Sequence, residues 1–326
     1  MLTVLLATRN GSRTLPNVLA SFSRLQAPSG GWKLVVIDNG STDRTCEIVT
    51  SFKTSLPLTY VFEEKPGKNV ALNTGLVHLK GDLAVFTDDD VLLDPDWLIR
   101  LRTAANEHPE CSVFGGVIRP RWEITPPHWI QWVDSRIVFT ITDPMTPEGA
   151  IDLAFVFGPN MAIRAEIFRA GTRFDTSIGP CGSSYPMGSE TELLMRLSRQ
   201  GHKGWHVRDA VVEHFIRKHQ LDESWVLGRA IRFGRGRFRI SQSPATSGFR
   251  SPFGIPLPLI SNLSRKLVKR ALSALSFNER AKFTAHWNYN YVLGHIIEAR
   301  LSSRERYIQR TSVELSVTRA DDGSAE

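Results

Sequence analysis

Apolar residues in the first third of the chain form short continuous runs, and the segments between these runs carry apolar residues at helical spacing. Such runs are typical of strands that are buried on both faces of a sheet. We expect strands at residues 2–8, 33–38, 59–63 and 82–87. We expect helices at residues 15–22, from a turn at 39–43 to about 52, at 68–79, and from 94 to about 108. This alternation predicts an α/β fold with a mostly parallel mixed sheet flanked by helices.

Three consecutive aspartates, Asp88 to Asp90, follow the fourth predicted strand. Ligands of such sheets bind at the carboxyl ends of strands, where Thr8 and Asp38 also lie, so one crevice could collect all of these groups. Alternation along an extended chain puts Asp88 and Asp90 on one side. Neighbouring carboxylates repel one another, and a hard cation such as Mg²⁺ or Mn²⁺ would neutralise them. The alternative is that one aspartate caps a turn and the others are solvated.

A second acidic group precedes a predicted helix at residues 189–192. Leucines lie three, four and seven residues after Glu190, so Glu190 shares their inward face. Ser189 and Glu192 match the capping box S-x-x-E, which gives Glu192 a structural role. Glu190 is then available as the general base for an acceptor hydroxyl. A purely structural role for both glutamates is the alternative.

Positive charge is concentrated in the last third of the chain. Residues 217–310 hold 18 Lys and Arg against 5 Asp and Glu, whereas residues 1–216 hold 21 against 24. Residues 262–275 predict a basic amphipathic helix, and residues 229–282 could contact an anionic membrane, or the helix could pack on the rest of the protein. No nucleic-acid-binding motif accompanies this charge, so nucleic acid is not an expected partner. We predict a disordered tail at residues 311–326.

Other features of the sequence indicate the cellular compartment of the protein. The chain has 326 residues, of which 41% are hydrophobic, enough for a substantial core. The N-terminus lacks the basic start of a secretory signal, and the uncharged stretch 251–264 is too short and too rich in proline to span a membrane. Cys46, Cys111 and Cys181 are widely separated and odd in number, which suits a reducing compartment. We expect a cytoplasmic protein, free or peripheral on the inner face of the plasma membrane.

Seven motifs in order resemble the bacterial family 2 glycosyltransferases of the GT-A fold. They are LLATRN, VVIDNGSTD, KPGKNVALNTGL, AVFTDDD, GPNMAIRAEIF, GSETELLMRL and DAVVEH, all within residues 1 to about 220. The resemblance implies a Rossmann-like GT-A sheet, a nucleotide-diphosphate-sugar donor, and Mn²⁺ or Mg²⁺ bound through a DxD-type motif. It implies a nucleotide-sugar-binding half at 1–115 and an acceptor and catalytic half at 116–220 of the same domain. The resemblance thins after residue 220, where the charge and the apolar spacing predict a basic helical C-terminal appendage at 221–310.

The resemblance also implies roles for single residues. The donor-binding residues would be Thr8 and Asp38 beside the nucleoside, Lys68 and Asn73 beside the nucleotide, and Asp88 and Asp89. Asp90 would be the direct metal ligand, although three identical residues leave their individual roles open. His214 after DAVVE would complete the metal site, or be an ordinary polar neighbour. The family usually carries Glu-Asp where this chain has Ser189-Glu190, so Glu190 aligns with the base and a one-residue slip would promote Glu192.

Three residues are candidates for contact with the acceptor. Trp122, in a tryptophan-rich stretch, suits stacking on a sugar ring but suits an ordinary core equally. Asn160, at an expected strand-to-helix junction, either contacts the acceptor or caps a helix. Glu192 is the third candidate.

These placements predict a metal-dependent inverting glycosyltransferase that moves a sugar to a hydroxyl of a glycan or lipid-linked acceptor. A nucleotidyltransferase is one alternative, but residues 5–14 contain a single glycine where a triphosphate loop needs several. A non-catalytic sugar-nucleotide-binding partner of a polysaccharide assembly system is the other. Such a partner would tolerate loss of Asp88, Asp90, Glu190 or His214, all of which are present.

Overall fold

The chain folds as two units. The computed structural model describes residues 1–182, 184–241 and 255–321, with side chains through residue 303. The first unit is Met1–Trp225 and the second is Val226–Glu326. The two halves expected at residues 1–115 and 116–220 therefore belong to one compact unit, which ends five residues after the expected boundary.

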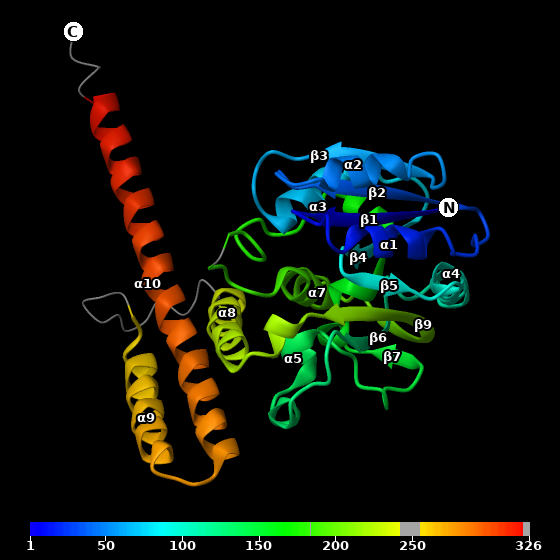
Figure 1. Cartoon of the computed structure of the whole chain (residues 1–326). Coiled ribbons are helices and arrows are strands. Elements are labelled where there is room, and N and C mark those ends of the chain that lie inside the picture. Colours follow the sequence, from blue (N-terminus) through cyan, green and yellow to red (C-terminus); the bar gives the residue numbers. More distant parts are fainter. Residues whose placement is uncertain (183, 242–254, 322–326) are drawn as a thin grey trace. The chain divides into compact units, whose positions relative to one another are not determined.

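Nine strands of the described part of the first unit form one mixed sheet (Figure 1). They are β1 (Leu2–Thr8), β2 (Trp32–Asp38), β3 (Leu58–Phe62), β4 (Leu83–Asp88), β5 (Val91–Leu93), β6 (Val113–Trp122), β7 (Gly149–Ile151), β8 (Met161–Arg164) and β9 (Gly204–Ile216). Their order is β3-β2-β1-β4-β8-β6-β9-β5, and β7 pairs with β9 beside this path. Strands β1 to β4 are parallel, and β8 is antiparallel to both β4 and β6. The mostly parallel mixed sheet predicted from the sequence is confirmed.

Helices cover both faces of this sheet. They are α1 (Leu15–Phe22), α2 (Thr45–Ser51), α3 (Lys68–Leu76), α4 (Trp97–Glu107), α5 (Ser135–Phe139), α6 (Ala165–Arg169) and α7 (Ser189–Arg199), with short 3₁₀ turns η1 (His128–Trp132), η2 (Leu153–Phe155), η3 (Gly158–Asn160) and η4 (Lys218–Leu221). Leu2, Val4 and Leu6 of β1 pack on the side of α1, α2 and α4. Leu5 and Ala7 pack on the side of α3, α6 and α7. Because both faces are covered, the central strands are apolar throughout.

The second unit is helical. It contains α8 (Glu223–Ser241, which begins at the end of the first unit), α9 (Leu257–Ala274) and α10 (Glu279–Asp321). Glu298 of α10 is fully buried and pairs with Arg235 and Arg239 of α8 at 2.9 Å and 2.5 Å. The two helices also meet at Gly234 and Gly294, where an added Cβ would lie 2.0 Å and 2.2 Å from a backbone oxygen of the other helix. Glycine is therefore required at this crossing.

Several local predictions differ from the structure. Helix α3 ends at Leu76 rather than near 79. Gly158-Pro159-Asn160 forms a 3₁₀ turn that leads into β8, so it is not a strand-to-helix junction. Helix α10 continues through Asp321, which contradicts the disordered tail for residues 311–321, while 322–326 lie outside the described residues. No helix among the described residues is long and apolar enough to cross a bilayer.

Candidate active site

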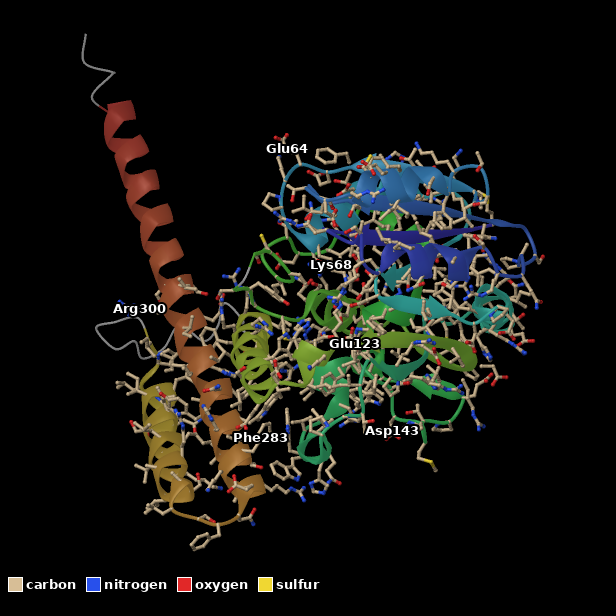
Figure 2. All side chains as sticks on the ribbon, viewed as in Figure 1. Glu64, Lys68, Glu123, Asp143, Phe283 and Arg300 are labelled. Carbon is tan, nitrogen blue, oxygen red and sulfur yellow. The ribbon has the colours of Figure 1, made fainter. Side chains whose placement is uncertain are left out.

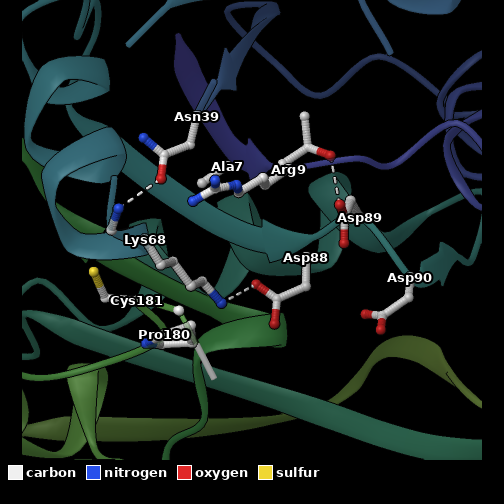
Figure 3. A pocket seen from close by; sticks show the side chains of 12 residues that line it. Ala7, Arg9, Asn39, Lys68, Asp88, Asp89, Asp90, Pro180 and Cys181 are labelled. Atoms are coloured by element: carbon white, nitrogen blue, oxygen red, sulfur yellow. Dashed lines mark hydrogen bonds and ion pairs between the residues drawn. The ribbon is translucent and has the colours of Figure 1, made fainter. Parts of the chain in front are cut away.

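A pocket of about 440 Å³ opens at the carboxyl ends of β1 and β4 (Figure 3). Its lining includes the predicted site residues Thr8, Lys68, Asp88, Asp89 and Asp90. Asp88 is the last residue of β4, and Asp89 and Asp90 form the turn into β5. The parallel sheet thus brings together groups that are up to 82 positions apart in sequence, as the strand order predicts.

Each of the three aspartates has a different partner. Lys68 Nζ forms an ion pair with Asp88, and Thr8 Oγ1 donates a hydrogen bond of 2.5 Å to Asp89. Asp90 Oδ1 lies 3.6 Å from His214 Nε2, and its Oδ2 lies 3.6 Å from Arg217 Nη2. The aspartates are distant from basic residues in the local sequence, but folding surrounds them with three basic side chains. Their charges are therefore partly compensated by the protein itself.

Burial and neighbouring charges shift the acidity of this cluster. Burial and the adjacent Asp90 carboxylate raise the pKa of Asp89 to about 7. Burial alone would raise the pKa of Asp90, but His214 and Arg217 bring it below its usual value. Burial would lower the pKa of Lys68, and the carboxylates of Asp88 and Glu190 raise it instead. The pocket therefore holds a charged ammonium group among carboxylates.

His214 is oriented as a metal ligand requires. Its Nδ1 donates a hydrogen bond of 2.7 Å to the carbonyl oxygen of Phe139, so in the neutral ring the lone pair lies on Nε2, facing Asp90. Burial would lower the pKa of His214, whereas Asp90 and the Phe139 carbonyl raise it. The Asp90 carboxylate suits Mn²⁺ or Mg²⁺, and a neutral imidazole nitrogen is a common metal ligand in proteins. Among the described residues there is no cluster of three His, Cys, Asp or Glu that could hold a metal, so Asp90 and His214 are a pair.

The β5–β9 ladder fixes the distance within this pair. Val91 is opposite His214 in the antiparallel register, and the backbone N–H of Phe215 donates to the Asp90 carbonyl at 2.9 Å. The ladder thus brings the backbone of Asp90 next to β9, and the turn conformation of Asp90 directs its carboxylate to His214.

Glu190 lies at the start of α7, close to the same pocket. Its carboxyl carbon lies 3.5 Å from the position that a Cβ on Gly158 would take, and its charge contributes to the raised pKa of Lys68. The predicted capping box is wrong, because Gly188 is the N-cap residue in a left-handed conformation and no side chain caps the helix. Ser189 Oγ is buried without a hydrogen-bond partner among the described residues. Glu190 does not line the pocket, but its charge acts on Lys68, which does.

Glu192 has another structural role than the one predicted. Both of its carboxylate oxygens accept hydrogen bonds from Arg196, at 3.0 Å and 2.8 Å. This pair one turn apart holds the carboxylate on the helix surface. The structure therefore gives Glu192 a partner within α7, and its contact with the acceptor stays a prediction.

Asn73 holds a loop and does not line the pocket. Its amide forms two hydrogen bonds of 2.9 Å with the backbone N–H and C=O of Phe174. Asn69, one turn earlier, donates to the carbonyls of Asp175 and Ile178. The loop then returns to the pocket at Pro180, whose carbonyl accepts from the Lys68 N–H at 2.9 Å. Asn73 thus helps to position the pocket rim, and its contact with the nucleotide stays a prediction.

Asp38 is almost completely buried at the end of β2, with 1% of its surface exposed. Its carboxylate accepts hydrogen bonds from the Ser41 N–H at 2.9 Å and from the Tyr60 hydroxyl at 2.8 Å. Both oxygens therefore already have partners within the protein. The nucleoside contact of Asp38 stays a prediction.

Asn160 is fully buried and is neither a helix cap nor open to an acceptor. Its amide nitrogen donates to the carbonyls of Val117 and Ala210, where the register of β6 and β9 shifts, and its oxygen accepts from Trp97 Nε1. Gly116 leaves room for this side chain, since an added Cβ would lie 2.3 Å from the Asn160 nitrogen. The acceptor prediction is wrong because the irregular sheet uses every polar atom of the amide.

Trp122 ends β6 and packs edge-to-face on the buried ring of Phe139 at 5.4 Å. It is partly exposed, and its contact with an acceptor stays a prediction. Arg217 is a residue that the sequence analysis missed. It follows β9 directly and approaches Asp90, and its Nε is buried without a hydrogen-bond partner in the described structure. The only sequence signal was its place three residues after His214.

Comparison with known proteins identifies the family. The sequence profile of glycosyl transferase family 2 matches residues 3–172, which is more than half of the chain. The chain belongs to glycosyl transferase family 2, and it is a glycosyltransferase. The succinoglycan biosynthesis protein ExoM of Rhizobium meliloti is 25% identical over 247 residues, covering 74% of this chain and 76% of ExoM. The validoxylamine A glucosyltransferase of Streptomyces hygroscopicus subsp. jinggangensis is 33% identical over 30% of this chain and 24% of its own length.

Solved structures share the fold. The mannosyltransferase PcManGT of Pyrobaculum calidifontis, in complex with GDP-Man and Mn²⁺, aligns with a TM-score of 0.58 and 20% identity over 91% of this chain and 86% of its own. S. aureus TarS 1-349 in complex with UDP aligns with a TM-score of 0.54 and 15% identity over 93% of this chain and 91% of its own. These similarities confirm the GT-A type fold.

Proposed function

We propose that this glycosyltransferase is metal-dependent and inverting, and that it moves a sugar from a nucleotide-diphosphate-sugar to a hydroxyl of a glycan or lipid-linked acceptor. The observation that carries the proposal is the Asp90–His214 pair at 3.6 Å, since Asp90 lines the same pocket as Lys68 and the charge of Glu190 acts on Lys68. The two alternatives, a nucleotidyltransferase and a non-catalytic binding partner, have no comparable support.

Basic side chains around the pocket suit the donor diphosphate. Lys68 and Arg9 line it, and Arg217 lies beside Asp90. Thr8, Asp88 and Asp89 are the proposed contacts to the rest of the donor. Asp90 and His214 are the residues that would hold Mn²⁺ or Mg²⁺, and such a cation, when bound, supplies Lewis-acid stabilisation of negative charge.

Glu190 is the proposed general base. Its carboxylate takes the proton of the acceptor hydroxyl while the acceptor oxygen forms a bond to the anomeric carbon. The bond from that carbon to the diphosphate oxygen breaks on the opposite face, and the electron pair leaves with the nucleoside diphosphate. A single displacement of this kind inverts the anomeric configuration.

The relatives support the choice of substrates. ExoM is described as a succinoglycan biosynthesis protein, which favours a polysaccharide as acceptor or product. The structural neighbours were solved with UDP, UDP-GlcNAc, and GDP-Man with Mn²⁺, which favours a nucleotide-sugar donor and a divalent cation.

A binding screen tests the proposal. Thermal shifts would be measured with UDP, GDP, CDP and dTDP, with and without Mn²⁺, on the wild type and on Asp90→Asn. We expect one diphosphate to stabilise the wild type only with Mn²⁺, and to lose that effect in the variant. Asp143→Asn is the control, because Asp143 is exposed and lies at another edge of the unit from Lys68 (Figure 2). Metal-independent binding, or no binding of any diphosphate, would contradict the proposal.

A further inference from the structure

Helix α9 carries an apolar face that the described protein leaves uncovered. Six large apolar residues of this face are between 37% and 82% exposed: Leu257, Ile260, Leu267, Val268, Leu272 and Leu275. At 100° per residue they lie within an arc of roughly 140°. Phe277, just beyond the helix, is also fully exposed. No residue of α9 is buried.

The side of α9 that is partly buried is mostly polar. Helix α9 packs along α10 (Figure 1), and its partly buried positions include Asn262, Lys266 and Arg270 together with Leu259 and Leu263. The Arg270 guanidinium lies 5.0 Å from the centre of the Tyr289 ring of α10. A helix of a water-soluble unit normally turns its apolar stripe inward. In α9 this orientation is inverted, so the apolar face is directed toward a partner outside the helix pair.

The charge around this face indicates what the partner is. Arg265 and Lys269 lie at one edge of the apolar arc, and residues 257–278 contain four Lys and Arg and no Asp or Glu. A second copy of the same helix would bring like charges together. An anionic lipid surface offers both apolar chains and negative headgroups.

We propose that α9 and Phe277 form an in-plane membrane anchor, with the apolar face in the acyl region and Arg265 and Lys269 at anionic headgroups. This proposed membrane contact includes fewer residues than the range 229–282 predicted from the sequence. Ala230, Gly234 and Phe238 of α8 are buried, and α8 contacts α10 closely, which removes this helix from the surface. Residues 242–254 lie outside the described residues. The anchor concerns where the enzyme works, so it goes beyond its proposed chemistry.

The test is co-sedimentation of the full chain with vesicles of phosphatidylcholine alone and of phosphatidylcholine with phosphatidylglycerol, without donor or acceptor. We expect the wild type to bind the anionic vesicles. Val268→Glu combined with Leu272→Glu should weaken this binding roughly 100-fold or more, because each apolar side chain that enters the acyl region strengthens binding at least about tenfold. Arg265→Gln combined with Lys269→Gln should weaken it roughly 30-fold, at about fivefold for each basic residue.

Two further variants serve as controls for vesicle binding. Val77→Glu changes an apolar residue of the first unit that is 77% exposed, and should leave vesicle binding unchanged. Asp90→Asn should also bind vesicles normally, so failure of the proposed catalytic function would not affect the result. Unchanged vesicle binding of Val268→Glu/Leu272→Glu would overturn the anchor. So would a loss of thermal stability in that variant without vesicles, which would place the face inside the protein, or a wild-type dimer that the variant abolishes.

Discussion

Helices α7 and α9 are both amphipathic, yet their apolar faces meet different surroundings. In α7, Leu193, Leu194 and Leu197 are fully buried under the sheet, and the first turn carries Glu190, whose charge acts on Lys68 of the pocket. In α9, no residue is buried, and the apolar face lies opposite the side that contacts α10. The spacing of apolar residues therefore predicts a helix and its apolar side, but it does not tell what covers that side.

The largest expected effect is a loss of catalytic turnover, caused by a substitution in α7. Glu190→Gln should lower turnover by about 10²- to 10⁴-fold, because the amide cannot accept the acceptor proton. Donor binding should stay nearly intact, which steady-state kinetics and calorimetry would check. Glu192→Gln is the matched control, since Arg196 already holds that carboxylate. Normal turnover of Glu190→Gln, or a comparable loss in Glu192→Gln, would refute the assignment of the base.

The second-largest expected effect is a loss of stability, and it tests whether the unit that contains α9 is tightly packed elsewhere. Glu298→Ala removes a buried carboxylate that pairs with Arg235 and Arg239. We expect a loss of about 3–5 kcal/mol in the free energy of unfolding, because two cations stay near a site that has lost its negative charge. Urea unfolding followed by circular dichroism measures it. Glu279→Ala, in an exposed pair with Lys282, should change it by less than about 0.5 kcal/mol. Equal effects of the two substitutions would contradict the expected difference between a buried and an exposed ion pair.

The third effect concerns the covered face of α7. Leu194→Ala should destabilise the first unit by about 2–5 kcal/mol, because the lost side chain leaves a cavity under the sheet. Thermal and urea unfolding of the variant provide the measurement. A change below about 1 kcal/mol would mean that the face is less tightly packed than its burial indicates.

The smallest effect is expected at the uncovered face of α9. Leu272→Ala removes a side chain that is 65% exposed, so the free energy of unfolding should change by less than about 0.5 kcal/mol. The same unfolding assay allows Leu272→Ala to be compared directly with Leu194→Ala. A loss as large as that of Leu194→Ala would show that the protein itself covers this face.

Much of the fold could be predicted because its signals are local. Strands β1, β2 and β4 are mostly buried on both faces and so leave continuous apolar runs, and the carboxyl-end rule brought Thr8 and Asp88 to Asp90 to one pocket. The contacts of polar residues were harder to predict from the sequence. The partners of Asn160 and Asn73 are groups 43 to 101 residues away, and no local pattern indicates them. Arg217 was missed for the same reason, since its neighbour Asp90 is distant in sequence.

The β5–β9 ladder has a consequence for how this family member can change over generations. Val91 pairs with His214, and the turn just before Val91 places the Asp90 carboxylate 3.6 Å from His214 Nε2. A slip of one residue in that pairing would turn His214 to the opposite face of the sheet. Insertions and deletions between Asp90 and Leu93, or between Val212 and His214, should therefore be excluded from active descendants. The loops before and after these strands can change in length over evolution. The paired segments of β5 and β9 must keep their lengths, because the position of His214 relative to Asp90 depends on them.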